Sequence, residues 1–213
     1  MHKAVIFDLD GTLLDTLQDL KNAVNMALEI NGLPKRTLDE VRQFVGNGVR
    51  NLMIRAVEDG EKHPEFEKIF ADFKAYYEMH CQEETGPYEG IMELLECLKK
   101  RGIKMAIVSN KVDSAVKVLA EEYFAGFFEA AIGEKEDVAK KPAPDMVFKA
   151  LERLGVEAKE AIYVGDSDVD IMTAMNAGLP CISVTWGFRD RDFLMLHGAS
   201  CFAKSPQELL RLL

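Results

Sequence analysis

Two aspartates near the start of the chain, Asp8 and Asp10, directly follow the apolar run Ala4–Phe7. A short apolar run that stops at turn-forming residues is typical of a buried strand, and Gly11 marks a sharp turn after it. Two carboxylates at the end of a buried strand can reach one point beyond it, and burying them is costly unless a cation or a reaction requires them. The pair therefore indicates a cation site or a reaction that requires both carboxylates, with an ordinary acidic turn as the alternative.

Four more apolar runs indicate strands, and the remaining polar candidates follow them. The runs cover residues 103–108, 130–132, 161–164 and 181–184. Ser109 and Asn110 follow the first run, and Lys141 lies some way past the second. Asp166 and Asp170 follow the third. Because ligands bind at the C-terminal ends of the strands in a doubly wound sheet, we expect these side chains at one edge.

The residue types expected at this edge are those that phosphoryl transfer requires. Several carboxylates suit a hard cation with oxygen ligands, for which Mg²⁺ is the expected ion. A lysine and a hydroxyl suit phosphate oxygens. Charge neutralisation and positioning supply most of the catalysis in this class of reaction. Each residue alone has an ordinary interpretation as a turn, a solvated loop or a helix cap. Their order and location together favour an enzyme acting on a small phosphorylated metabolite.

Helical patterns fill the intervals between the later strands. They cover residues 112–123, Asp145–Leu154 and Asp168–Ala177. In the last of them, Ile171, Met172 and Met175 are expected on one apolar face. Strands that alternate with helices predict an α/β, doubly wound, Rossmann-like core with a mainly parallel sheet that is covered on both faces.

The interval between the first two strands has no strand pattern and is predicted to be all-helical. Asp15 is placed to cap a first helix, and Thr37 and Glu40 have the spacing of a capping box. We therefore divide the chain into an α/β core of residues 1–15 and 86–213 and a helical cap subdomain of residues 16–85. An insert beside the C-terminal edge of a strand is placed to act as a lid over the ligand crevice, with simple decoration as the alternative.

Charge and composition narrow the partners and the location of the protein. The 213 residues carry a formal net charge of −10, which argues against nucleic acid or membrane as the main partner, because a phosphate backbone needs a basic surface. No signal-peptide pattern and no apolar run of about 18 residues is present, so we expect a cytoplasmic protein. Its four scattered cysteines lack CxxC spacing and indicate reduced core residues. We expect a monomer or a homodimer.

The motifs together resemble those of the haloacid dehalogenase-like (HAD) hydrolase superfamily. They stand here as Asp8-Leu9-Asp10-Gly11-Thr12, Ser109-Asn110, Lys141 before Pro142, and Gly165-Asp166-Ser167 through Asp170. The match covers nearly the whole chain, and the set in this order is specific although no single motif is. The helical insert resembles the α-helical type of cap in that family.

This resemblance implies catalytic and metal-binding roles for four aspartates. Asp8 is then the nucleophile that becomes phosphorylated. Asp10 is the acid that protonates the leaving alkoxide and the base that later activates water. Mg²⁺ is held by Asp8, by the backbone carbonyl of Asp10 and by Asp166. Asp170 lies further out or binds the ion through water.

The resemblance also implies a set of phosphate-binding residues. Ser109 and Lys141 contact the transferring phosphoryl group, together with backbone N–H groups of the first motif, and Asn110 supports their loop. The full set is Leu9, Gly11, Thr12, Ser109, Asn110 and Lys141.

Two further segments resemble one branch of the superfamily, the phosphoglycolate phosphatases. They are Phe44-Val45-Gly46-Asn47-Gly48-Val49-Arg50-Asn51-Leu52 in the insert and Trp186-Gly187-Phe188 after the last strand. The loop Gly46-Asn47-Gly48 offers N–H groups to a ligand, and Arg50 offers a fork for a carboxylate, although a surface arginine is the alternative. The resemblance implies 2-phosphoglycolate as the leading substrate.

Other functions remain as alternatives at this point. Asp10 disfavours a dehalogenase, which lacks an acid there because a halide leaves without a proton. A sugar phosphomutase of the β-phosphoglucomutase kind uses the same pair of aspartates, and other relatives act on other phosphate monoesters or on pyrophosphate. A signalling receiver domain uses similar residues, but it lacks a long helical insert and its phosphorylated Asp follows an interior strand. A non-catalytic binding module is the last alternative.

Overall fold

The computed structural model describes residues 2–46 and 48–213 of the chain. The chain forms two compact units. The core unit consists of Met1–Leu14 and Pro87–Leu213, and the helical unit consists of Asp15–Gly86. The short strands β2 (Leu14–Asp15) and β3 (Gly86–Pro87) pair where the chain passes from one unit to the other.

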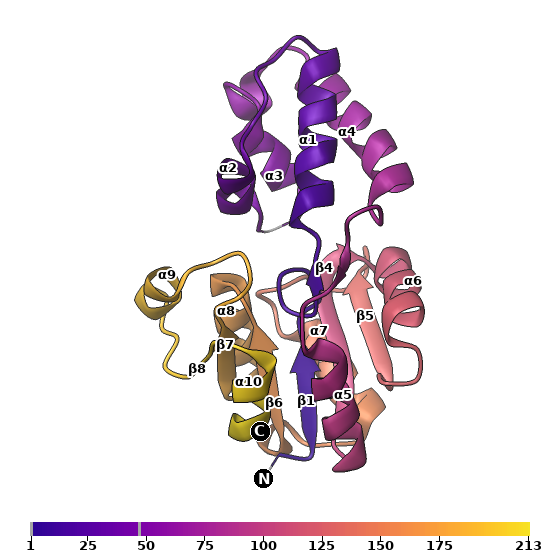
Figure 1. Ribbon diagram of the computed structural model, residues 1–213, viewed down its shortest axis with the longest axis vertical. Helices are drawn as coiled ribbons and strands as arrows, with labels where there is room; N and C mark the ends of the chain where they lie inside the picture. Colours follow the sequence, from indigo (N-terminus) through magenta and orange to yellow (C-terminus); the bar gives the residue numbers. More distant parts are fainter. Residues whose placement is uncertain (1, 47) are drawn as a thin grey trace. The chain divides into compact units, whose positions relative to one another are not determined.

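A six-stranded sheet forms the centre of the core unit (Figure 1). Its spatial order is β5-β4-β1-β6-β7-β8, and neighbouring strands are parallel. The strands are β1 (Ala4–Phe7), β4 (Lys104–Val112), β5 (Ala130–Glu134), β6 (Ala161–Gly165), β7 (Cys181–Val184) and β8 (Phe202–Ala203). The predicted α/β fold with a mainly parallel sheet is confirmed.

The side chains of β1 alternate between two hydrophobic cores, one on each face of the sheet. Val5 and Phe7 pack in the core that includes apolar residues of α5 (Ile91–Lys100), α6 (Asp113–Phe124) and α10 (Pro206–Leu212). Ala4 and Ile6 pack in the core that includes α7 (Asp145–Leu154) and α8 (Asp168–Ala177). Because successive side chains of a strand point to opposite faces, a strand buried on both faces has an uninterrupted apolar sequence. This is why the first strand could be recognised from four residues.

The position of β1 changes one argument made from the sequence. β1 lies between β4 and β6, so it is itself an interior strand. Strand position therefore does not distinguish this chain from a receiver domain, contrary to the expectation. The long helical unit still distinguishes the two.

The buried face of α8 differs from the one predicted. Ile171 is buried as expected, but Met172 and Met175 are exposed. The core side of the helix is formed instead by Ala174 and Ala177, three and six positions after Ile171. This spacing is the stripe of an amphipathic helix, and its small residues carry a weaker hydrophobic signal than the exposed methionines do.

Four α-helices are described in the helical unit, together with a 3₁₀ turn at Gly60–Lys62. They are α1 (Leu17–Ile30), α2 (Leu38–Phe44), α3 (Val49–Ala56) and α4 (Phe66–His80). The carboxylate of Asp19 on α1 accepts hydrogen bonds from the N–H groups of Glu84 and Thr85 and from the hydroxyl of Thr85, which fastens the end of the unit to its first helix. Among the described residues, the chain has no helix long and apolar enough to cross a membrane.

The predicted helix start is confirmed for α2, whereas the predicted N-cap of α1 is wrong. Thr37 and Glu40 form the predicted capping box at the start of α2. Asp15 is not the N-cap of α1, which is Thr16. The Asp15 carboxylate accepts the N–H of Leu17 at 3.2 Å, so it still binds a free donor of the first turn from one position further out.

Candidate active site

The polar candidates belong to three strands that lie side by side. Asp8 follows β1, Ser109 and Asn110 lie in the last part of β4, and Asp166 follows β6. β4 and β6 both pair with β1 in parallel, so the C-terminal ends of the three strands meet at one edge. β4 continues through an irregular register between Val108 and Val112, which makes Ser109 and Asn110 part of the strand rather than a turn after it.

Lys141 lies between two buried carboxylates. Its Nζ is 2.8 Å from Asp8 Oδ1 and 2.7 Å from Asp170 Oδ1, and it donates to the hydroxyl of Tyr163 at 3.3 Å. Lys141 is 3% exposed and Asp170 is fully buried. Charges that are removed from water interact strongly, so this lysine is a major source of positive charge for the carboxylates around it.

Three aspartates form a compact cluster at this edge. One carboxylate oxygen each of Asp8, Asp166 and Asp170 lies within 4.8 Å of the others, and all three residues are buried. A single lysine leaves two of three ionised carboxylates uncompensated, which is unfavourable in a buried site. Asp8 Oδ2 accepts no hydrogen bond from the described residues, whereas Oδ1 is bound by Lys141. An all-carboxylate set with an open oxygen suits a hard divalent cation.

Burial and mutual repulsion raise the pKa values of two of these carboxyl groups. The pKa of Asp8 lies well above its usual value because of burial and then the Asp170 carboxylate, with Lys141 acting in the opposite direction. The pKa of Asp166 is raised to about 7 by burial and then Asp170, against the N–H of Phe188. Burial alone lowers the pKa of Lys141, but Asp170 and Asp8 outweigh it and hold the pKa well above its usual value. The cluster thus holds more negative charge than the protein alone stabilises.

Asp170 is fixed by the helix start that follows β6. Its Oδ2 accepts hydrogen bonds from the hydroxyl and the N–H of Ser167, which is the N-cap of α8 and forms a capping box with Asp170. Its Oδ1 accepts from Lys141 and, at 3.2 Å, from the Tyr163 hydroxyl. Sequence reasoning missed Tyr163, because a tyrosine inside an apolar strand gives only the signal of a core residue. Both oxygens of Asp170 are bound by protein groups, which suits a supporting position.

The turn after β1 uses much of its own hydrogen-bonding capacity. The N–H of Leu9 donates to Asp8 Oδ1 at 2.7 Å, and the N–H groups of Gly11 and Thr12 donate to carbonyls within the turn. The Thr12 hydroxyl donates to Asp166 Oδ1 at 3.2 Å. Gly11 and Thr12, predicted as phosphate ligands, are therefore engaged with the turn itself and with the carboxylate cluster.

Asn110 and Ser109 shape the other side of the site. The Asn110 amide donates to the carbonyl of Lys141 and accepts the Lys141 N–H. Ser109 is buried, and its oxygen accepts the N–H of Lys111 at 3.2 Å, while the described residues provide no acceptor for its hydroxyl hydrogen. Asn110 thus supports the lysine segment, and Ser109 keeps a donor for a ligand.

Asp10 is the more exposed member of the first pair. Its Oδ1 lies 3.2 Å from Lys111 Nζ, with 21% and 12% of the two side chains exposed. Lys111 was not among the predicted site residues, although its position directly after Ser109 and Asn110 was the signal that could have identified it. The structure therefore gives Asp10 a cation of its own, separate from Lys141.

Arg50 in the helical unit is engaged in ion pairs within that unit. Its guanidinium pairs with Glu61 and Glu67 and lies over the rings of Phe66 and Phe70. Arg50 does not offer a free fork to a substrate carboxylate, contrary to the expectation, because two protein carboxylates already bind it. The surface-arginine alternative describes it better.

The glycine loop before α3 is held by an arginine that sequence reasoning missed. Arg55 donates to the carbonyl oxygens of Phe44 and Gly46 at 2.6 and 3.2 Å. Gly46 and Gly48 have φ values of 124° and 88°, and Gly48 is the N-cap of α3. Asn47 lies outside the described residues. Glycine adopts positive φ values without strain, so the backbone conformation alone accounts for a glycine at both positions.

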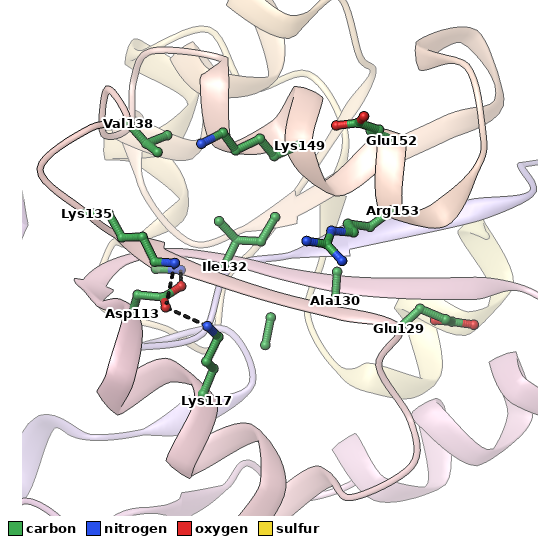
Figure 2. Close-up of a pocket in the computed structure, with 12 residues that line it drawn as sticks. Asp113, Lys117, Glu129, Ala130, Ile132, Lys135, Val138, Lys149, Glu152 and Arg153 are labelled. Atoms are coloured by element: carbon green, nitrogen blue, oxygen red, sulfur yellow. Dashed lines mark hydrogen bonds and ion pairs between the residues drawn. The ribbon is translucent and has the colours of Figure 1, made fainter.

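A surface cleft lies elsewhere in the core unit, between β5, α6 and α7 (Figure 2). Asp113 pairs there with Lys117 at 2.8 Å and with Lys135 at 3.2 Å, and Lys149 and Arg153 come from α7. The twelve residues that line it include no member of the aspartate cluster. We therefore place the chemistry at the ends of β1, β4 and β6 and not in this cleft.

The chain is similar to known proteins over most of its length. Residues 5–184 match the family model described as haloacid dehalogenase-like hydrolase. The chain is 37% identical over 213 residues to the phosphoglycolate phosphatase of Pseudomonas syringae pv. tomato, and the match covers 97% of this chain and 75% of that protein. It is 38% identical over 207 residues to the phosphoglycolate phosphatase of Rhodobacter capsulatus, with 95% and 93% covered.

Solved structures with a similar fold cover the chain almost completely. A candidate phosphoglycolate phosphatase from Lactobacillus delbrueckii subsp. bulgaricus matches with a TM-score of 0.95 and 39% identity, covering 100% of this chain and 98% of that one. A candidate β-phosphoglucomutase from Thermotoga maritima matches with a TM-score of 0.77 and 25% identity, covering 99% and 97%.

Proposed function

The chain belongs to the haloacid dehalogenase-like hydrolase family, and we propose that it is a phosphatase that hydrolyses 2-phosphoglycolate through a phosphorylated Asp8. The observation that supports this most strongly is the contact of Lys141 with Asp8 inside a cluster of buried aspartates. Such a site concentrates a nucleophile, a fixed cation and further carboxylates at the ends of neighbouring strands.

Asp8 is the proposed nucleophile. One of its oxygens is fixed by Lys141 and the N–H of Leu9, and the other is open. Attack by this carboxylate on phosphorus forms an acyl phosphate while the bond from phosphorus to the ester oxygen breaks. Splitting one displacement into two steps in this way is the advantage of covalent catalysis.

Asp10 is the proposed acid and base. In the first step its proton passes to the leaving alkoxide, and in the second its carboxylate takes a proton from the water that attacks the acyl phosphate. Free phosphate and intact Asp8 result. Asp10 is suited to this work because it lies two residues from Asp8 and remains partly exposed, beside Lys111.

Lys141 and Ser109 are the proposed ligands of the transferring phosphoryl group. A carboxylate that attacks a phosphate dianion is repelled by its negative charge. The buried ammonium group of Lys141, which contacts the Asp8 carboxylate, reduces this repulsion. The Ser109 hydroxyl is buried and has a hydrogen to donate. Asn110 acts through Lys141, whose main chain it binds.

Asp8, Asp166 and the main-chain carbonyl of Asp10 are the groups that we propose hold Mg²⁺, with Asp170 behind them. The donor set fits a hard cation, because it is built from carboxylate oxygens whose charge Lys141 does not fully compensate. Bound there, the ion would supply positive charge to the phosphoryl oxygens.

The substrate proposal rests on the relatives that carry the name phosphoglycolate phosphatase. We propose that the helical unit serves as a cap that selects the substrate, in keeping with its place in the chain directly after the first motif. A sugar phosphomutase is the second candidate, supported by the structural likeness to the Thermotoga maritima protein.

Phosphate release from a panel of esters tests this proposal. The panel contains 2-phosphoglycolate, sugar phosphates, nucleotides and pyrophosphate, each assayed with Mg²⁺. We expect free phosphate, with 2-phosphoglycolate among the substrates of highest kcat/KM, and isomerisation of a sugar phosphate without phosphate release would favour the mutase. Asp8→Asn should abolish turnover, while the control Asp15→Asn, at an exposed aspartate of the helical unit, should retain it.

A further inference from the structure

The loop of residues 185–190, between β7 and α9 (Arg191–Leu196), contacts the aspartate cluster. The N–H of Phe188 donates to Asp166 Oδ2 at 2.7 Å. The indole N–H of Trp186 donates to the carbonyl of Thr12 at 3.0 Å. The first of these bonds holds a carboxylate of the cluster, and the second holds the turn that follows the proposed nucleophile.

Gly187 lets this loop approach closely. A Cβ at this position would lie closer than 3.0 Å to the carbonyl oxygen of Gly11 and to the Cβ and Oδ2 of Asp166. A Cβ at Gly11 would be equally close to the Asp166 carboxyl group and to the ring of Phe188. The two glycines therefore pack against each other and against one carboxylate, and main-chain atoms cannot move aside as the end of a flexible side chain can.

The Asp166 carboxylate is thus held by two separate loops. Oδ1 accepts from the Thr12 hydroxyl, and Oδ2 accepts from the Phe188 N–H. Trp186 joins the two loops, because its indole binds the main chain of Thr12. Loss of the indole bond would leave both donors in place but allow the loops to move relative to each other.

We infer that the 185–190 loop sets the orientation of the Asp166 carboxylate for a divalent cation, with Trp186 and Gly187 as positioning residues. The inference rests on the proposed function only in that the cation is the one that the phosphatase would use. Groups that orient a metal ligand tune the affinity of the site without touching the metal themselves.

Trp186→Phe tests the indole bond with little change in packing. The ring of phenylalanine keeps an aromatic side chain against the core, where Trp186 is partly buried, and removes only the N–H donor and some volume. The matched control is Thr185→Val, which removes a neighbouring hydroxyl that donates to the carbonyl of Ala203, away from the cluster. Each variant removes one side-chain donor of the 185–190 loop, and in each case the acceptor is a main-chain carbonyl outside the loop.

Titration calorimetry with Mg²⁺ alone measures the affinity of each variant. We expect Mg²⁺ binding to weaken about fivefold in Trp186→Phe, the effect of one ordinary hydrogen bond, and to stay within twofold in Thr185→Val. At saturating Mg²⁺, kcat and KM of Trp186→Phe should return to within about twofold of the wild-type values. A purely structural role would not produce recovery by the metal.

Gly187→Ala gives the larger perturbation, and we expect Mg²⁺ affinity to fall tenfold or more. Circular dichroism of the variant checks its fold, and Trp186→Phe decides the matter if the alanine variant does not fold. Wild-type Mg²⁺ affinity in Trp186→Phe, or equal losses in Trp186→Phe and Thr185→Val, would overturn the inference. If the wild-type chain binds Mg²⁺ and hydrolyses no ester, the proposed function fails while the inference stands, and absence of Mg²⁺ binding by the wild type overturns both.

Discussion

The side-chain amide of Asn110 binds the main chain of Lys141 at two points, donating to its carbonyl at 3.0 Å and accepting its N–H at 2.8 Å. Asn110 belongs to β4, while Lys141 lies in a turn before α7. The pair therefore fastens the turn to the sheet at the residue whose ammonium group contacts Asp8. A strand thus controls the position of a charge that is carried by an irregular segment.

Asn110→Ala should lower kcat about tenfold or more, because Lys141 loses both main-chain anchors and small misplacements of a catalytic group are expensive. The unfolding free energy should fall by about 1–3 kcal/mol. Steady-state kinetics and urea unfolding measure the two effects. The control is Asn176→Ala, which removes one exposed hydrogen bond to the carbonyl of Pro142 in the same turn and should leave kcat near the wild-type value. Wild-type kcat in Asn110→Ala would contradict this account.

Lys141→Met should destabilise the fold as well as abolish turnover. Removing the ammonium group leaves Asp8 and Asp170 buried without their shared cation, and breaking a buried ion pair in this way costs about 3–5 kcal/mol. Urea unfolding without added metal measures the loss. Lys140→Met, at the neighbouring exposed lysine that pairs with Glu134, should change stability by less than about 1 kcal/mol. Equal stability of the two variants would argue against a charged, buried Lys141.

Mg²⁺ should stabilise the wild-type chain against heat. A ligand at about one hundred times its Kd adds about 2.7 kcal/mol, or roughly 5–10 °C in Tm for a chain of this size. Asp166→Asn should reduce this shift, because it removes one carboxylate of the cluster. Thermal unfolding with MgCl₂ and with NaCl at equal ionic strength checks the prediction. An identical shift with both salts, or in both proteins, would be evidence against a specific cation site.

Asp113 should contribute to stability at neutral pH and lose that contribution in acid. Burial alone would raise the pKa of Asp113, but Lys117, the N–H of Gly133 and Lys135 outweigh it and lower the pKa. A lowered folded-state pKa means that the stabilisation is present above the unfolded-state pKa and disappears as the pH falls through the folded-state value. Asp113→Asn should therefore be less stable than the wild type at pH 7.

The stability difference between the wild type and Asp113→Asn should shrink as the pH falls below about 4. Urea unfolding across this range measures it. Asparagine keeps an oxygen for the Gly133 N–H, so the variant removes mainly the charge that pairs with the two lysines. Asp137→Asn, at an exposed aspartate nearby, is the control and should show little pH-dependent difference from the wild type. A difference for Asp113→Asn that is independent of pH would contradict the assigned ion pairs.

Local patterns were sufficient for five of the six strands of the sheet and for the order of its polar strand ends, whereas the two-residue edge strand β8 was not predicted. Ala4–Phe7 has an uninterrupted apolar sequence because β1 is buried on both faces, and this made it recognisable without any knowledge of its neighbours. Parallel alternation with helices then placed Asp8, Ser109 and Asp166 at one edge. Face assignment was weaker, since Ile171 shares the buried stripe of α8 with Ala174 and Ala177 rather than with the exposed methionines.

The contacts that organise the site could not be predicted from the sequence, because most of them join residues that are far apart in the chain. Nothing local to Thr12 indicates that its hydroxyl binds Asp166 or that Trp186 binds its carbonyl. Tyr163 has the pattern of a core residue, and only the fold brings its hydroxyl to Asp170. Arg50 illustrates the reverse case, in which a residue suited to a ligand is bound by carboxylates of its own unit.

The most direct test of the central claim is to trap the phosphoryl group on Asp8. The chain is mixed briefly with 2-phosphoglycolate and Mg²⁺, quenched in acid, reduced with borohydride and digested, and the peptides are sequenced by mass spectrometry. Reduction converts an aspartyl phosphate to an alcohol, so the account predicts homoserine at position 8 in the wild type and an unmodified peptide in Asp8→Asn. Reduction at another aspartate, or rapid hydrolysis with Asp8 unmodified throughout, would contradict it.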